Sequence, residues 1–222
     1  QGCLPLDNVK KYLKFLEKFC KINNIILIFD ELITGIRIRP GSIQRKYKIN
    51  ADITTIGKIV GGGLPIGMIG ISEKINKIMK RKKIKVFFGG TFSGNSLSSF
   101  IGNETLKFLL KNKKLFSNLN KKCLHFQKNL NQFIQKEKIG AKVYRFDSIL
   151  RIVFSKKEIK NRAQRDFFEK KNVSKLVKFR QYLLDNKIYY PTSGIIFLSD
   201  STSYKSINYV LKHIKFALKK LI

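Results

Sequence analysis

The chain has 222 residues, 43% of them hydrophobic, which suits one large or two modest domains with a real core. No segment reaches the roughly 18 uninterrupted apolar residues of a membrane span, so we expect no membrane partner. The net charge of +32 would suit a nucleic-acid-binding protein, but only nine of the 46 basic residues are arginine and the lysines are scattered, so we expect solvated surface charge instead.

The amino-terminal sequence predicts a helix followed by a strand. The first residues, QGCLPLDNVKKYL, lack an initiator methionine and the pattern of a signal peptide, so we expect a chain cut from something longer. Residues 7–22 form an amphipathic pattern with Asp7 as a plausible N-cap. The run IILIFD at 25–30 predicts a strand buried on both faces, as in a parallel sheet, and 36–50 predicts a loop.

A run of three glycines interrupts the next part of the sequence. Two short strands, within ADITTIGK (51–58) and PIGMIGIS (65–72), are expected on either side of it. Ser72 is placed to cap a short helix that runs through about Met79. Longer helices are expected over 95–113 and over 117–138, where Gly140 would end the second one.

The remaining sequence changes in character. Strands are expected in AKVYRFDS and ILRIVFS, a helix over 161–186, short strands around a turn in IYYPTSGIIFLS, and a closing helix over 203–222. Strands grouped with helices in this order suggest a small α+β domain after an α/β part. We place the boundary between about residues 108 and 118, which gives domains 1–112 and 113–222.

The cysteines indicate neither a disulfide framework nor a metal site. Cys3, Cys20 and Cys123 are an odd number without metal-ligand spacing. Cys20 and Cys123 fall on apolar helix faces, where a free thiol behaves as a small hydrophobe. A reducing cytoplasm fits this usage best.

Three segments combine a reactive or polar side chain with glycines at the expected end of a strand. They are FDELITG (29–35), TIGKIVGGGLPIG (55–67) and GGTFSGN (89–95). In open α/β sheets, ligands bind at the carboxyl ends of strands. These segments are therefore the candidates for a binding site.

Each of the three reactive positions has an ordinary interpretation as well as a chemical one. Asp30 is either a turn acid or a carboxylate that keeps a ring nitrogen protonated, as pyridoxal phosphate chemistry requires. Lys58 is either a surface charge or, if apolar neighbours bury it and lower its pKa, an amine free for imine formation. Thr91, among small residues before a helix, is either part of a turn or part of an anion site.

Together, the motifs LIFDELITGIR, ADITTIGKIVGGGLPIG and GGTFSGN closely resemble class III pyridoxal-phosphate aminotransferases, and most of all the group with glutamate-1-semialdehyde aminomutase. The resemblance covers essentially the whole chain. It implies fold type I, aspartate aminotransferase-like. The large domain would be partial, with a mostly parallel sheet, and only the family's carboxyl-terminal half would be present.

The resemblance also assigns roles to individual residues. Lys58 matches the Schiff-base lysine, Asp30 the partner of the pyridine nitrogen, and Leu32 the residue that packs on the ring, where valine is usual. Gly90 and Thr91 match positions that reach the cofactor phosphate of the neighbouring subunit, which implies a homodimer with shared active sites. The expected cofactor is pyridoxal 5′-phosphate, and the expected reaction moves an amino group from a small-molecule donor to a carbonyl acceptor.

The sequence also departs from the family. The amino-terminal half, with its Ser-Gly-Thr phosphate loop and stacking aromatic, is missing, and Ser96 follows Asn95 where proline is common. Ser201-Thr202 replaces the usual His-Thr. In the aminomutases a glutamate precedes the FLS segment, and no acid stands there in this chain. The missing acid favours a transaminase over an aminomutase. Arg151 is a candidate for holding a substrate carboxylate or phosphate, or is a cross-strand surface arginine.

Three other functions stay open. The first is an aminomutase-type isomerase. The second is a catalytically incompetent remnant that keeps only a dimerisation or binding surface. The third is a basic nucleic-acid-binding protein, although no recognised binding module is present.

Overall fold

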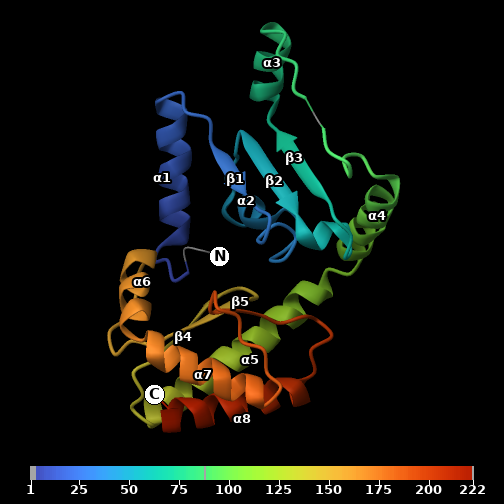
Figure 1. Cartoon of the computed structure of the whole chain (residues 1–222). Helices are drawn as coiled ribbons and strands as arrows, with labels where there is room; N and C mark the ends of the chain where they lie inside the picture. Colours follow the sequence, from blue (N-terminus) through green and yellow to red (C-terminus); the bar gives the residue numbers. More distant parts are fainter. Residues whose placement is uncertain (1–3, 88, 222) are drawn as a thin grey trace. The chain divides into compact units, whose positions relative to one another are not determined.

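The computed structural model describes residues 4–87 and 89–221 (Figure 1). The chain forms two compact units. One is Asn8–Lys114, and the other is Leu115–Ile222 together with the segment that ends at Asp7. Within the second unit, hydrogen bonds hold the amino-terminal segment to the rest, from Asp7 N to Lys160 O (3.1 Å) and from Arg165 Nη1 to Leu4 O (2.8 Å).

The unit Asn8–Lys114 is built on a three-stranded sheet in the order β1-β2-β3. β1 runs parallel to β2, and β2 runs antiparallel to β3. In Figure 1, α3 projects beyond the end of β3. The elements in chain order are α1 (Val9–Ile22), β1 (Ile28–Asp30), α2 (Ser42–Tyr47), β2 (Ile53–Gly57), the 3₁₀ helix η1 (Lys58–Gly61), β3 (Gly67–Ile71), α3 (Glu73–Arg81) and α4 (Ser96–Lys111).

Several local predictions in this unit are confirmed and others are wrong. Ser72 caps α3, because its hydroxyl accepts from Ile75 N (3.4 Å). α1 is preceded by Asn8 in the left-handed region, so Asp7 is not its N-cap. The predicted loop 36–50 contains α2, because Gly41 and the residue after it both take positive φ and turn the chain into a short helix.

The strand predicted at 25–30 is shorter and more exposed than expected. Only Ile28–Asp30 pairs as β1, and of these three residues only Phe29 is buried. β1 lies at the edge of the sheet and is bonded on one side only, to β2. A strand buried on both faces needs cover that this unit does not supply among its described residues.

Many apolar side chains of this unit are exposed. α1 shows them along one face, with Phe15 and Phe19 stacked at 5.8 Å between ring centroids. The edge strand β3 is exposed along its whole length. Large exposed apolar patches mark interaction surfaces. The residues concerned include Tyr12, Phe15, Phe19, Ile22, Ile25, Ile26, Ile28, Met68, Ile69 and Ile71.

The glycine run forms the tight turn that the sequence predicts, and Gly62 is its most constrained position. Gly62 has φ +58°, and a Cβ placed on it would lie 2.3 Å from Thr105 Oγ1 and 2.9 Å from Ile101 Cγ2, both on α4. The glycine therefore allows α4 to pack closely against η1.

We expect Gly62→Ala to lower the free energy of unfolding by about 2 kcal/mol, because a left-handed conformation costs a non-glycine residue roughly 1–2 kcal/mol and the new methyl group also meets α4. Gly67→Ala is the matched control, since no atom lies within 4 Å of a Cβ placed on Gly67 and its φ is not positive. Urea denaturation compares the two. Equal stabilities would contradict the close packing.

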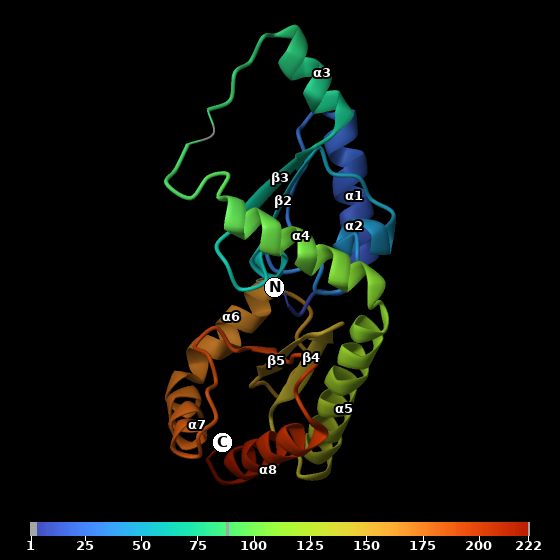
Figure 2. The same ribbon diagram turned by 90° about the vertical axis from the view of Figure 1, so that its right-hand side faces the viewer.

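The second unit packs helices around the antiparallel sheet β4-β5-β6. β5 pairs with β4 on one side and with β6 on the other. Figure 2 shows α5, α7 and α8 gathered around this sheet. The elements are α5 (Lys114–Lys136), β4 (Lys142–Phe146), β5 (Ile149–Val153), α6 (Arg162–Lys171), α7 (Val173–Asp185), β6 (Ile195–Phe197) and α8 (Tyr204–Leu221).

This unit holds the continuous hydrophobic core. β5 is buried along its whole length, between its two neighbours. Phe179 lies edge-on to two rings, those of Phe154 (5.4 Å) and Tyr190 (5.2 Å). Fully buried members of the core include Cys123, Phe126, Leu130, Val143, Leu150, Phe179, Leu183 and Ala217.

Three predictions in this unit need correction. The helix predicted over 161–186 is two helices that break at Asn172, whose amide side chain donates to Phe154 O (3.2 Å) and Phe168 O (2.8 Å). IYYPTSGIIFLS gives one strand, β6, rather than two. After α5, the left-handed residue is Lys138 (φ 55°) and not Gly140.

Cys20 and Cys123 are buried, and Cys3 lies outside the described residues. Throughout the described part of the chain, no helix is both long enough and apolar enough to cross a membrane. The same residues contain no group of three or more His, Cys, Asp or Glu arranged to hold a metal ion.

Candidate active site

Asp30 and Lys58 lie at the carboxyl ends of two neighbouring parallel strands. Asp30 is the last residue of β1 and is in register with Thr55 of β2. Lys58 comes directly after Gly57, the last residue of β2. Because β1 and β2 run in the same direction, both residues lie at the carboxyl edge of the sheet, where ligands of open α/β sheets bind.

The carboxylate of Asp30 is held by the turn that follows it. Its Oδ1 accepts a hydrogen bond from the backbone N–H of Leu32 at 3.0 Å. Among the described residues, the other oxygen, Oδ2, has no recorded partner, and the side chain is exposed. Asp30 is thus oriented by its own backbone while keeping one acceptor available.

Leu32 lies directly against the end of β2. A Cβ placed on Gly57 would be 2.9 Å from Leu32 Cδ2. Any larger residue at position 57 would push this side chain away. The absence of a side chain on Gly57 therefore lets Leu32 sit next to the residue that precedes Lys58.

Lys58 is exposed, so its apolar sequence neighbours do not bury it in this chain. The backbone leaves the sheet at this point and enters η1, with the lysine at φ 54°, a region that few non-glycine residues adopt. Lys48, at a similar φ, is a helix C-cap, whereas Lys58 begins a helix. No hydrogen bond or ion pair to the amine is recorded in the described chain.

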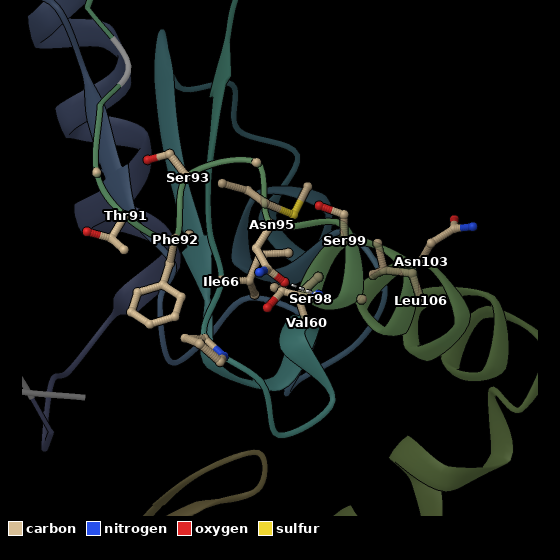
Figure 3. A pocket seen from close by; sticks show the side chains of 16 residues that line it. Val60, Ile66, Thr91, Phe92, Ser93, Asn95, Ser98, Ser99, Asn103 and Leu106 are labelled. Carbon is tan, nitrogen blue, oxygen red and sulfur yellow. Dashed lines mark hydrogen bonds between the residues drawn. The ribbon is translucent and has the colours of Figure 1, made fainter.

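Gly90 and Thr91 line a cavity of about 990 Å³. Figure 3 shows Thr91, Phe92 and Ser93 on the loop before α4, and Ser99, Asn103 and Leu106 on the helix itself. Asn95 caps α4 by accepting from Ser98 N (2.9 Å).

The lining of this cavity includes Val60 of η1 and Gly67 of β3 but not Asp30, Leu32 or Lys58. The structure therefore places three of the predicted site residues at the carboxyl edge of the sheet, and the other two, Gly90 and Thr91, in the lining of a cavity that does not include those three.

Arg151 is committed to a buried ion pair. Its Nε donates to Glu169 Oε1 (3.0 Å), and its Nη2 donates to both Oε1 and Oε2 (2.8 Å each). The arginine is only 6% exposed. A Cβ placed on Gly194 would be in ordinary van der Waals contact with the guanidinium, 3.4 Å from Nη2, so it is the φ of +70° that favours glycine there. Arg151 is therefore neither a surface arginine nor an unengaged anion ligand in this chain.

The sequence reasoning did not single out Glu31. Its side chain is 1% exposed, whereas that of its neighbour Asp30 is exposed. The sequence feature that could have drawn attention to Glu31 is its position next to Asp30 in a chain with only 14 acidic residues. A buried acid needs partners inside the protein, and these partners are described below.

Comparison with known proteins identifies the family. Residues 6–177 match the family model of class-III aminotransferases. The glutamate-1-semialdehyde 2,1-aminomutase of Methanococcus vannielii is 39% identical over 225 residues, and that of Caldicellulosiruptor bescii is 33% identical over 211 residues. These matches cover 99% and 93% of this chain but only 50% and 47% of the relatives, so the chain spans about half their length.

Solved structures show the same fold. A glutamate-1-semialdehyde aminomutase from Pseudomonas aeruginosa in complex with PMP superposes with a TM-score of 0.83 at 15% identity, covering 98% of this chain and 49% of that one. An omega-transaminase from Sphaerobacter thermophilus gives 0.82 at 20% identity, with 96% and 48% covered.

The fold is thus that of type I pyridoxal-phosphate enzymes, as the motifs predicted. The cofactor named by the resemblance, pyridoxal 5′-phosphate, is supported by the family match and by similar structures that hold PMP or PLP. The motifs, the parallel pair β1-β2 with its acid and lysine, and the family match over most of the chain agree. The chain belongs to the class-III aminotransferase family.

Proposed function

We propose that this chain carries the lysine-bearing part of a pyridoxal-phosphate-dependent aminotransferase. The observation that supports this most strongly is the pairing of Asp30 and Lys58 at the ends of adjacent parallel strands. Each has a polar atom without a recorded partner in the described chain. An available carboxylate oxygen and an available amine are the two groups that the ring nitrogen and the aldehyde of this cofactor require.

The side chains at this edge fit the cofactor in chemistry. Asp30 Oδ2 would accept from the protonated ring nitrogen, Leu32 would pack against the ring, and Lys58 Nζ would bond to the aldehyde carbon. When bound, the ring acts as an electron sink for the negative charge that develops at the substrate carbon. Lys58 Nζ, when it is not bonded to the aldehyde carbon, would serve as the general base that takes the proton from the substrate carbon.

The separate position of Gly90 and Thr91 supports a second copy of the chain as partner. In a homodimer with shared sites, these two residues would contact the cofactor phosphate held by the other subunit. They lie on the exposed loop before α4 and not beside Lys58, as such an arrangement needs. Sedimentation equilibrium tests this point, and a monomer at all concentrations would contradict it.

The aminomutase reaction is a second candidate, because the relatives described above are named glutamate-1-semialdehyde 2,1-aminomutases. Against it stands the absence of an acid before FLS. A transaminase needs a separate carbonyl acceptor, whereas a mutase rearranges one substrate. Turnover of glutamate-1-semialdehyde without added keto acid would favour the mutase.

The role of Asp30 gives a direct test of the proposed site. We expect Asp30→Ala to weaken the binding of pyridoxal phosphate by about 10- to 100-fold, since a hydrogen bond to a charged group contributes roughly 1.5–3 kcal/mol. Glu104→Ala, which removes an exposed carboxylate from α4 of the same unit, is the control and should change little. Absorbance titration measures both. Equal affinities for Asp30→Ala and the unmodified chain would contradict the proposal.

A further inference from the structure

Glu31 is buried beside the candidate active site and is bonded through one carboxylate oxygen. Its Oε2 accepts from the hydroxyl of Thr34 at 2.9 Å and from the backbone N–H of Ile43 at 3.3 Å. Ile43 lies in the first turn of α2, where backbone N–H groups have no partner within the helix. The carboxylate therefore supplies an acceptor that this helix end needs.

The backbone of Glu31 is equally engaged. Its N–H donates to Thr55 O of β2 (2.9 Å), and its carbonyl accepts from Gly35 N (2.7 Å). The second bond closes a turn over 31–35 that contains Leu32. Gly35 fits this turn because it has no side chain: a Cβ there would lie 2.4 Å from Glu31 O. Glu31 thus joins β2, the turn after Asp30 and the start of α2.

The second carboxylate oxygen shows that charge pairing is not what holds Glu31. Among the described residues Oε1 has no hydrogen-bond partner, and no ion pair to Glu31 is recorded. Glu31 lines a cavity of about 270 Å³ whose lining contains no basic residue and is mostly apolar, with Ile36, Pro40, Ile56, Leu106, Leu109 and Leu110. An amide group could replace Oε1 here without losing either bond to Oε2.

We propose that Glu31 is a positioning residue for the active site. Its two side-chain hydrogen bonds hold the turn 31–35 against α2. This turn fixes the carboxylate of Asp30 through the N–H of Leu32, and it holds the Leu32 side chain against Gly57. This inference rests on the proposed function, in which Asp30 and Leu32 contact the cofactor.

The first test needs no cofactor. In the full chain, Glu31→Ala should speed amide hydrogen exchange in the peptide that covers residues 32–43 by about tenfold, the factor that corresponds to 1.4 kcal/mol. Glu31→Gln should exchange as the unmodified chain does, because its carbonyl oxygen keeps both bonds. Glu104→Ala is the control for loss of an acid. Unchanged exchange in Glu31→Ala, or equal acceleration in Glu31→Gln, would overturn the positioning role.

The second test connects the turn to cofactor binding. Glu31→Ala should weaken the affinity for pyridoxal phosphate about tenfold, and Glu31→Gln should restore it to within about threefold. Thr34→Val removes only one of the two donors to Glu31, so its affinity for pyridoxal phosphate should lie between those of the two Glu31 variants. It provides a second test if the alanine variant fails to fold. If the unmodified chain binds selectively at Lys58 but Glu31→Ala binds equally well, the inference fails. Absence of selective binding in the unmodified chain would instead overturn the proposed function.

Discussion

Replacing Lys58 by alanine is expected to abolish the shift in visible absorbance that pyridoxal phosphate acquires when it bonds to a protein lysine. Lys58 is the residue directly after β2. Its amine has no hydrogen-bond or ion-pair partner among the described residues. Loss of this one group should therefore remove the signal completely, and not merely weaken it.

The control for this result is a lysine of the same unit away from the site. Lys77, exposed on α3, is suitable, and Lys77→Ala should keep the absorbance shift. Lys58→Arg keeps the positive charge but cannot form the covalent bond, so it should behave like the alanine variant. A Lys58→Ala protein with the full absorbance shift would contradict the assignment of the lysine.

Replacing Arg151 by alanine is expected to lower the free energy of unfolding of the second unit by about 3 kcal/mol, the lower end of the range for breaking a buried ion pair. The lower end applies because the Glu169 side chain keeps 23% of its surface exposed and can be partly solvated. Urea denaturation followed by tyrosine fluorescence reports on this unit, which contains most of the tyrosines.

Arg162→Ala is the matched control, because that arginine pairs with Asp166 at the surface with 64% of its side chain exposed. Surface pairs contribute about 0–1 kcal/mol, so this variant should be nearly neutral. If Arg151→Ala were as stable as the control, the buried pair would not be structural, and Arg151 would again become a candidate for anion binding.

The elements with strong local signals could be predicted from sequence. Ser72 before α3 and Asn95 before α4 have short side chains that accept from the helix backbone, and both caps are present. The β4-β5 pair and the long helix α5 follow from hydrophobic periodicity, which packing in the second unit preserves. These features depend on neighbours in sequence, so one segment contains the information.

The features that failed depend on neighbours in space. IILIFD reads as a buried strand, but β1 has only one neighbouring strand in the described chain. Whether the apolar sequence neighbours of Lys58 bury it could not be decided from sequence, because the chain leaves the sheet at that residue. The break at Asn172 depends on two carbonyls, one of them in the distant Phe154. No periodicity reports contacts of this kind.

The same limit applies to the candidate site. Asp30, Leu32 and Lys58 could be named because a family resemblance gave them roles, and those roles stay predictions until they are measured. Glu31 was missed because its importance comes from Thr34, Ile43 and Thr55, which only the folded chain brings together.

The most direct test of the central claim is to map where pyridoxal phosphate bonds to the chain. The full chain is mixed with the cofactor and reduced with borohydride, and the labelled peptides are identified by mass spectrometry. We predict that the label is confined to the peptide that carries Lys58. Label spread over the many surface lysines, or no label, would contradict an active site at the ends of β1 and β2.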